Sequence, residues 1–323
     1  MYKKHKVSVV QSGGDFLLNT IALNKGGESL PAGCLFALGC FDGLHPGHRA
    51  LLCGAKKRAD EKGVPLAVWS PQGAKKTSLL LPLADKLKQL SFLGADFYVE
   101  EPFEEIRDLS PEDFFSHYLL EQYKASALAC GENFTFGRGA SGNAALLESL
   151  CRKAGIDLYV QKTFEYRGKA VSSAAVRQAL AEGNIADATG ILGRPYSIHG
   201  KTLPGRQIGR KLGFPTLNLP LPGDCPLGNG VYAVQVQLRG RSLPGVANVG
   251  IHPTFENAAS PLCEAHLLDF SFQGELYGEE ILVEFLKMLR KERAFDSPEA
   301  LRAQVEEDKK RAREFFGKER AVL

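Results

Sequence analysis

The chain has 323 residues, of which 44% are hydrophobic and 24% charged, and its formal net charge is +3. This ordinary globular composition excludes a disordered or collagen-like chain. Acidic and basic residues are interspersed along most of the sequence, which gives no broad electrostatic case for binding nucleic acid or an anionic membrane. At roughly 100–200 residues per domain, the length predicts two domains.

The first half of the chain alternates short apolar runs with longer amphipathic ones. We expect strands at residues 35–38, 65–69, 96–99, 125–130 and 157–160, and helices at 47–62, 84–93, 111–122 and 143–154. The helix at 111–122 has a clear start, because Ser110 can cap its free amides and Pro111 suits the first helical position. Strands and helices that alternate at this spacing predict an α/β fold with a parallel sheet between helices.

The pattern changes near residue 185. Two short helices, expected at 174–181 and 185–192, are followed by segments in which apolar and polar residues alternate with a period of two. We expect strands at 196–202, 231–238, 245–249, 264–269 and 280–285, and a final helix from Ser297 to near Gly317. These elements predict a small antiparallel β-barrel with a terminal helix, and they place the two domains at 1–186 and 187–323.

The cysteines and the N-terminus bear on the cellular compartment. The seven cysteines are an odd number without a CxxC pair and lie mostly in apolar runs, which predicts buried, reduced thiols and a cytoplasmic protein. Residues 1–10 are basic but precede no apolar signal segment, and no stretch reaches the ~18 apolar residues of a membrane span. We therefore expect a cytoplasmic protein with no membrane partner.

A histidine pair lies where the first predicted strand meets the first predicted helix, within residues 39–48, GCFDGLHPGH. Glycines let the backbone approach a ligand closely, and a helix N-terminus favours a phosphate. The HxGH spacing can bring His45 and His48 to one side of the turn, where they could stabilise charge on an attacked phosphate without a covalent intermediate. The alternative is a tight turn that carries two polar surface histidines.

The segment 41–48, FDGLHPGH, resembles the first signature of HxGH nucleotidyltransferases. Its form resembles that of the adenylyltransferase half of bacterial bifunctional riboflavin kinase/FAD synthetases. The resemblance implies that Gly39 and Phe41 contact ATP and that His45 and His48 are the catalytic residues of adenylyl transfer.

A second segment, 131–137, GENFTFG, resembles the flavin and nucleotide pocket of the same family. The resemblance implies that Asn133 lies at the nucleotide or Mg²⁺ end of that pocket and that Phe134 and Phe136 lie near the isoalloxazine ring. Taken by themselves, two phenylalanines at this spacing are more typical of a strand end packed on the core.

Residues 171–177, VSSAAVR, stand where the family has an ISSTxxR-like signature whose hydroxyls and arginine hold ATP phosphates. Ser172, Ser173 and Arg177 match that signature, whereas Ala174 replaces its threonine. The family also usually reads TFxPHP where this chain has VWSPQG at 68–73, with Trp69 in the expected pocket and Gln72 in place of a histidine.

These departures leave a second interpretation open. In it, the chain is a riboflavin kinase whose N-terminal domain is a weak or inactive adenylyltransferase and acts as a scaffold or a flavin-binding module. A flavin-responsive regulatory protein is a third and more distant interpretation.

A glycine-rich loop, GRQIGRKLGFPTLN, occupies residues 205–218. Gly205, Gly209 and Gly213 allow backbone amides to wrap phosphate oxygens, and Arg210 adds positive charge. The loop matches neither a P-loop nor a strand-to-helix GxGxxG, and a basic surface loop is the alternative interpretation.

The end of that loop closely resembles the flavokinase signature, with Leu217 in place of the usual alanine. The resemblance implies that Thr216 and Asn218 coordinate Mg²⁺ and ATP phosphate, and hydroxyl and amide oxygens are ligands that suit Mg²⁺. The segment 264–270, EAHLLDF, also matches and implies that Glu264 is the base for the ribityl 5′-hydroxyl. His266 falls on the same strand face and is expected to be structural rather than a second base.

The matching segments follow one another in register from about Gly39 to Phe316. They imply an N-terminal Rossmann-like HxGH nucleotidyltransferase domain and a C-terminal β-barrel flavokinase domain, an α/β plus β architecture. The implied enzyme phosphorylates riboflavin to FMN with Mg-ATP and adenylylates FMN to FAD with release of pyrophosphate. FMN and FAD are then substrate and product rather than prosthetic groups.

Two expectations concern partners and surface. The mixed charge runs at 290–293 and 306–311 are expected to be solvated helix faces rather than a nucleic-acid patch. No nucleic-acid partner is expected, and self-association is left open by the sequence.

Overall fold

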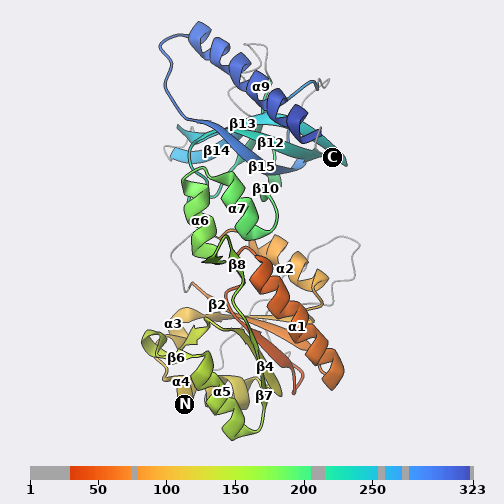
Figure 1. Ribbon diagram of the computed structural model, residues 1–323, viewed down its shortest axis with the longest axis vertical. Coiled ribbons are helices and arrows are strands. Elements are labelled where there is room, and N and C mark those ends of the chain that lie inside the picture. The colour runs from red at the N-terminus through yellow and green to blue at the C-terminus, as the bar shows by residue number, and fades with distance from the viewer. Residues whose placement is uncertain (1–29, 74–78, 205–214, 254–258, 271–275, 321–323) are drawn as a thin grey trace. The chain divides into compact units, whose positions relative to one another are not determined.

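The computed structural model describes residues 30–73, 79–204, 215–253, 259–270 and 276–320, and the chain forms two compact units that divide between Val171 and Ser172 (Figure 1). The division predicted from the sequence falls later, between residues 186 and 187. Helix α6 (Ser173–Ala181) belongs to the second unit, where the carbonyl of its Leu180 accepts a hydrogen bond from the Gly228 backbone at 3.1 Å. The assignment of one activity to 1–186 and the other to 187–323 stays a prediction.

The first unit is built on a five-stranded parallel sheet in the order β3-β2-β1-β4-β7. Its strands are β1 (Leu35–Leu38), β2 (Leu66–Gln72), β3 (Phe97–Pro102), β4 (Ala127–Gly131) and β7 (Asp157–Gln161). The strand order reverses at β1, as it does in doubly wound folds, whose ligands bind at the carboxyl ends of the strands near this point. The predicted Rossmann-like architecture is therefore confirmed.

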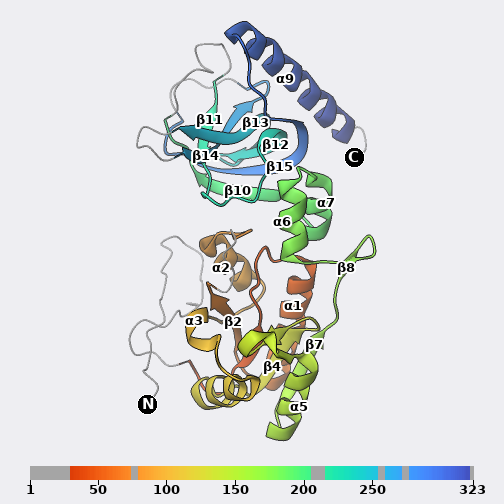
Figure 2. The same ribbon diagram turned by 90° about the vertical axis from the view of Figure 1, so that its left-hand side faces the viewer.

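Helices cover both faces of this sheet, as the two views of Figures 1 and 2 show. Leu35 and Ala37 of β1 pack with helices α1 (Pro46–Lys62) and α2 (Leu83–Phe92). Phe36 and Leu38 point the other way, into a cluster with residues of helix α5 (Ala144–Ala154). Because β1 is buried on both faces, all four of its residues are apolar.

The helix predicted at 111–122 is not a continuous α-helix. It begins as α4 (Pro111–Asp113), with Ser110 as its cap, and continues as a π-helix, η1 (Phe114–Gln122). At its end the Tyr123 N–H donates to the Tyr118 carbonyl five residues earlier, at 2.9 Å. The smaller elements are α3 (Phe103–Ile106), β5 (Thr135–Phe136), η2 (Arg138–Ala140), β6 (Gly142–Asn143), β8 (Glu165–Tyr166) and β9 (Lys169–Ala170).

The second unit contains a six-stranded antiparallel sheet in the order β10-β15-β12-β13-β14-β11, which confirms the predicted barrel. Its elements are α6, α7 (Ile185–Leu192), β10 (Tyr196–Lys201), β11 (Leu217–Pro220), β12 (Gly230–Leu238), β13 (Arg241–Pro253), β14 (Ala259–Leu267), β15 (Glu280–Lys291) and α9 (Pro298–Arg320). The Leu203 N–H donates to the Asn218 carbonyl at 2.8 Å, a bridge that joins the two edges and nearly closes the barrel.

Strand β12 shows how the barrel is filled. Tyr232, Val234 and Val236 are fully buried and alternate with residues of the outer face. On that outer face, Val231 and Ala233 pack with Ala312 of α9, which runs along the outside of the barrel (Figure 2). The helix continues past Gly317, where the sequence predicted its end, to Arg320.

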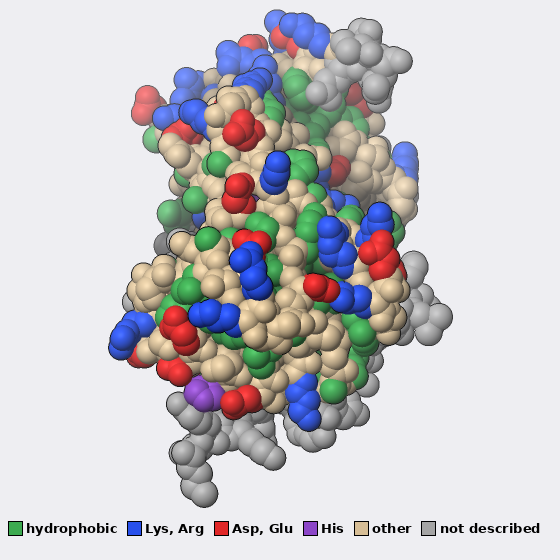
Figure 3. Space-filling model, turned by 60° about the horizontal axis from the view of Figure 1, so that its bottom comes forward, with side chains coloured by type: hydrophobic (Ala, Val, Ile, Leu, Met, Phe, Trp, Pro, Cys, Tyr) green, Lys and Arg blue, Asp and Glu red, His purple; other side chains and the backbone are tan. Residues whose placement is uncertain are grey.

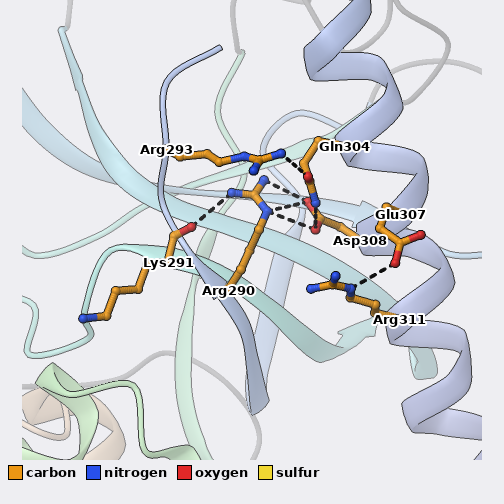
Figure 4. A network of polar contacts seen from close by, with 7 residues as sticks. All are labelled: Arg290, Lys291, Arg293, Gln304, Glu307, Asp308 and Arg311. Carbon is orange, nitrogen blue, oxygen red and sulfur yellow. Dashed lines mark hydrogen bonds and ion pairs between the residues drawn. The ribbon is translucent and has the colours of Figure 1, made fainter.

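Most residues of the two mixed charge runs are exposed or half-buried, but Arg290 and Asp308 meet in a buried ion pair that fastens α9 to the barrel (Figure 4). The first run also begins on strand β15 rather than on a helix. Arg290 lies at the end of β15, and its guanidinium donates to both carboxylate oxygens of Asp308 at 2.8–3.0 Å. The Asp308 side chain is only 2% exposed. Gln304 also donates to Asp308, at 2.8 Å, and accepts from Arg293.

The distribution of surface charge agrees with the sequence, whereas the burial of the cysteines agrees with it only in part. On the face shown in Figure 3, acidic and basic side chains of the described residues are interspersed. None of the helices in the described ranges is long and apolar enough to cross a membrane. All seven cysteines lie in described segments as free thiols, but only four are buried and Cys53 is exposed, because it lies on a solvent-facing position of α1.

Candidate functional site

The turn between β1 and α1 carries the first group of predicted site residues. His45 is the N-cap of α1, and its Nδ1 accepts a hydrogen bond from the backbone N–H of His48 at 3.3 Å. Pro46 takes the first helical position, which needs no N–H donor. The two histidines are thus fixed to the N-terminus of a 17-residue helix, where the helix dipole favours negative charge.

The two imidazole rings of this turn are stacked. The ring centroids of His45 and His48 lie 3.6 Å apart with an interplanar angle of 18°, and Phe41 lies 5.3 Å from the ring of His48. This confirms that the HxGH spacing brings both rings to one side of the turn. Because His45 is 7% exposed, its ring is not a freely solvated surface histidine.

The backbone of the same turn is strained. Phe41 and Leu44 have φ values of 49° and 43°, in the left-handed region that residues with a side chain rarely adopt. Both side chains are completely buried, so that packing holds the backbone in this conformation. A Cβ at Gly39 would lie 3.3 Å from the Phe41 ring, so a larger residue would crowd the turn.

The residues predicted for the flavin pocket follow β4. Asn133 is exposed, Phe134 is half-buried and Phe136 is 7% exposed. The two phenylalanine rings stack at 5.7 Å and 13°, and Phe136 also lies 5.7 Å from Phe114 of the π-helix. Phe136 is therefore a core residue, as its spacing alone suggested, whereas Phe134 keeps part of its ring accessible. Trp69 belongs to the same cluster, 5.2 Å from Phe114.

The predicted phosphate-binding serines lie at the start of α6, in the second compact unit. Ser172 is the N-cap of this helix and accepts a hydrogen bond from the Ala175 N–H at 3.2 Å. Ser173 is buried and Arg177 half-buried, and both have polar partners. Ala174, which stands in the place of the family's threonine, is exposed.

A row of polar residues crosses three neighbouring barrel strands. Asn218 of β11 is the direct cross-strand partner of Glu264 on β14, and Glu264 is in turn the partner of Asn248 on β13. Residues that face each other in this way lie on the same side of a sheet. The flanking Leu217 and Leu219 are buried on the other side, in the barrel interior. The register thus brings two predicted site residues together and adds Asn248, whose position beside Glu264 depends on strand pairing that a motif does not show.

This row offers ligands for a divalent cation. Asn218 is 5% exposed, and among the described residues its Oδ1 has no hydrogen-bond partner. An unpaired buried acceptor is costly unless something binds it. Thr216 lies two residues earlier and is half-buried. A hydroxyl, an amide oxygen and the nearby carboxylate of Glu264 are the oxygen ligands that Mg²⁺ prefers, so the residues present fit this ion.

His266 lies two residues beyond Glu264 on the same strand face. Its Nδ1 lies 3.0 Å from the carbonyl oxygen of Pro215, the residue directly before Thr216. Burial lowers the pKa of His266, which favours a neutral ring that donates from Nδ1 to this carbonyl. The structural role expected for His266 is supported by this contact.

Four further predicted residues, Gly205, Gly209, Arg210 and Gly213, lie outside the described residues.

Comparison with family models matches both halves of the chain. Residues 28–175 match the FAD synthetase family and residues 192–316 match the riboflavin kinase family. The matches occur in the order expected from the sequence, and each covers one of the two groups of site residues apart from Arg177, which follows the first match by two positions.

Complete proteins align over nearly the same span. The chain is 39% identical over 295 residues to the bifunctional riboflavin kinase/FMN adenylyltransferase of Escherichia coli K12, covering 88% of this chain and 93% of that one. It is 36% identical over 296 residues to the protein of the same description from Bacillus subtilis, covering 87% and 92%. A crystal structure from Streptococcus pneumoniae, described as a macrolide-efflux protein, has 26% identity and a TM-score of 0.75 over 88% of this chain and 95% of its own.

Proposed function

Because the chain belongs to the family of bifunctional riboflavin kinase/FMN adenylyltransferases, we propose that it phosphorylates riboflavin to FMN with ATP and then adenylylates FMN to FAD, releasing pyrophosphate. The observation that carries the proposal is the presence of both family domains, each with its own polar site. The aligned region spans 88% of this chain and 93% of the Escherichia coli relative, so it includes both domains.

In the kinase reaction, Glu264 accepts the proton of the ribityl 5′-hydroxyl while Thr216 and Asn218 hold Mg²⁺ and ATP phosphate. The cross-strand pairing of Asn218 with Glu264 supports this division of roles, since it keeps the base and the metal ligand on one face. Mg²⁺ would supply neutralisation of phosphate charge. A carboxylate base suffices, because phosphoryl transfer depends mainly on positioning and charge stabilisation. Gly205, Gly209, Arg210 and Gly213 are proposed to wrap the phosphates.

In the adenylyl transfer, His45 and His48 stabilise the charge that develops on the α-phosphate of ATP. Their stacked rings at the N-terminus of α1 support this role, because fixed donors need no reorganisation as the charge develops. We assign the remaining contacts as the family resemblance implies. Gly39, Phe41, Ser172, Ser173 and Arg177 contact ATP, and Asn133, Phe134 and Phe136 belong to the flavin and nucleotide pocket.

The kinase-only interpretation rested on Ala174, Trp69 and Gln72. Trp69 is 3% exposed and packs in the aromatic core, so this departure alters core packing. Ala174 lies on an exposed position of α6, and Gln72 is exposed at the end of β2. The described residues around these positions give no support to the loss of the second activity. A cytoplasmic location stays a prediction, and self-association stays open.

Two variants test the assignment, and each carries its own control in the other half of the chain. Glu264→Gln should slow FMN formation from riboflavin by about 10²–10⁴-fold, with FAD formation from FMN unchanged. His48→Ala should slow FAD formation from FMN by a similar factor without changing FMN formation. If either variant lowered both rates equally, or neither, the assignment of the two activities to these residues would be wrong.

A further inference from the structure

Lys86 of α2 is a buried cation that the two reactions above do not use. Its side chain is 5% exposed, and its Nζ donates to the carbonyl oxygen of Cys40 at 2.9 Å and to the hydroxyl of Tyr98 at 2.8 Å. Cys40 lies two residues beyond the end of β1 and one residue before Phe41, where the strained turn begins. The ammonium group therefore lies directly against the turn that carries the histidine pair.

Several other groups complete the surroundings of this ammonium. Tyr98 donates in turn to Glu100 at 3.1 Å, and Lys86 also lies 3.4 Å from the Ser70 hydroxyl. Ser70 donates to the same Cys40 carbonyl at 3.3 Å. Strand β2 and helix α2 therefore each donate to one carbonyl of the turn, and Tyr98 of β3 accepts a further hydrogen bond from the ammonium group.

A second hydrogen bond ties the same turn to the residues that lead into α2. The Leu80 backbone N–H donates to Oδ1 of Asp42 at 2.8 Å, and Asp42 is 5% exposed. The segment 80–86 thus donates hydrogen bonds to the turn at two points, the carbonyl of Cys40 and the carboxylate of Asp42. Between and beside these points the backbone takes the left-handed conformations of Phe41 and Leu44.

Burial of an ammonium group is unfavourable, and it lowers the pKa of Lys86 despite the nearby charges of Glu100 and Asp42. An apolar side chain of similar volume would avoid this desolvation cost and would leave Ser70 as the side-chain donor to the Cys40 carbonyl. Core packing alone therefore gives no reason for a lysine here. The location of Lys86 suggests a functional reason, because ligands of parallel sheets bind at the carboxyl ends of the strands, where Cys40 lies.

We propose that Lys86 is a positioning residue for adenylyl transfer, which holds the Cys40 carbonyl and so fixes the turn that presents His45 and His48. The inference rests on the proposed function of that histidine pair. It assigns the segment 80–86 a role as a clamp on the turn, which is separate from any contact with the nucleotide or the flavin.

The test is Lys86→Met, which keeps an unbranched side chain one atom shorter and removes the charge and the donor. The kcat of FAD formation from FMN should fall about ten- to a hundredfold, the rate equivalent of one charge-assisted hydrogen bond, with KM for FMN and ATP changed less than threefold. The matched control is Lys88→Met, on an exposed position of the same helix. FMN formation from riboflavin should stay at the wild-type rate in both variants.

The fluorescence of Trp69, the single tryptophan of the chain, reports the integrity of the first unit in each variant. A wild-type kcat in Lys86→Met would overturn the inference, and so would a loss that merely follows a lowered unfolding temperature. If Lys86→Met does not fold, Ser70→Ala removes the other donor to Cys40 and should reduce kcat by a few-fold; an unchanged rate there would also overturn it. Absence of FAD formation in the wild-type chain would instead refute the proposed function.

Discussion

Replacing Asp308 with alanine would leave the guanidinium of Arg290 without its carboxylate partner. In the native chain, Arg290 Nε lies 3.0 Å from both Asp308 oxygens and Nη2 lies 2.8 Å from Oδ2. The side chains of Arg290 and Asp308 are 16% and 2% exposed. After the substitution, water could reach Arg290 only in part, so most of its charge would remain uncompensated.

The expected destabilisation follows from this burial. Removing one partner of a buried ion pair destabilises a protein by about 3–5 kcal/mol. We expect the lower end of this range, because Arg290 keeps its hydrogen bond to the Lys291 carbonyl and some contact with solvent. A loss of about 3 kcal/mol corresponds to a fall of about 6–12 °C in the unfolding midpoint.

Circular dichroism during heating, together with residual FMN formation after heating, would measure this loss. Glu307→Ala is the control one residue away, because Glu307 pairs with Arg311 on an exposed surface and should contribute less than about 1 kcal/mol. The double variant Arg290→Met/Asp308→Leu removes both charges and should recover most of the stability. The reasoning would be refuted if Asp308→Ala matched the control, or if the double variant were as unstable as the single one.

His266, Asn218 and the exposed thiol of Cys53 offer separate tests. The variant His266→Asn keeps a donor near the Nδ1 position and should retain kinase activity. The variant His266→Gln should raise KM for ATP about three- to tenfold in steady-state assays. Burial lowers the pKa of His266, so the unfolded chain binds a proton before the folded chain does as the pH falls below about 6.5, and the free energy of unfolding decreases toward acid pH. Denaturant unfolding at a series of pH values should show a smaller decrease in His266→Asn than in the wild type. Equal decreases in the two chains would contradict this prediction. Asn218→Ala should raise the Mg²⁺ concentration for half-maximal FMN formation about tenfold or more, and an unchanged Mg²⁺ titration would exclude Asn218 as a ligand. Iodoacetamide should modify the exposed Cys53 well before the buried Cys130 and Cys151, because burial raises the pKa of these two thiols to about 12 and about 11. Mass spectrometry measures the rate of modification of each cysteine, and equal rates would contradict this prediction.

The fold was predictable where local patterns report burial. The all-apolar β1 sequence predicts a strand covered on both faces, and the alternation in β12 predicts one wall of a barrel, as observed. The short strand β11 was not predicted, because its residues Leu217–Pro220 follow directly on a motif that reads as a loop. The π-helix was also missed, because residues 114–122 read as an ordinary continuation of the helix that begins at Pro111.

The same distinction applies to the candidate sites: features set by neighbouring residues could be predicted from the sequence, and contacts between distant residues could not. The HxGH spacing is local, so the placement of both histidines on one side of the turn could be expected from four residues of sequence, whereas the stacking of their rings was not predicted. The pairing of Asn218, Glu264 and Asn248 depends on strand register, and the contact of Lys86 with Cys40 joins residues 46 positions apart. The two charge runs look solvated in sequence because each is mixed, yet Arg290 and Asp308 meet through tertiary packing.

A time course of the purified chain with Mg-ATP, in which riboflavin, FMN and FAD are separated by chromatography, distinguishes an enzyme with both activities from a kinase alone. One reaction starts from riboflavin and a second from FMN. The account predicts that FMN rises before FAD in the first reaction and that FAD and pyrophosphate form together in the second. Accumulation of FMN in the first with no consumption of FMN in the second would contradict it, and would leave a kinase joined to an inactive adenylyltransferase domain.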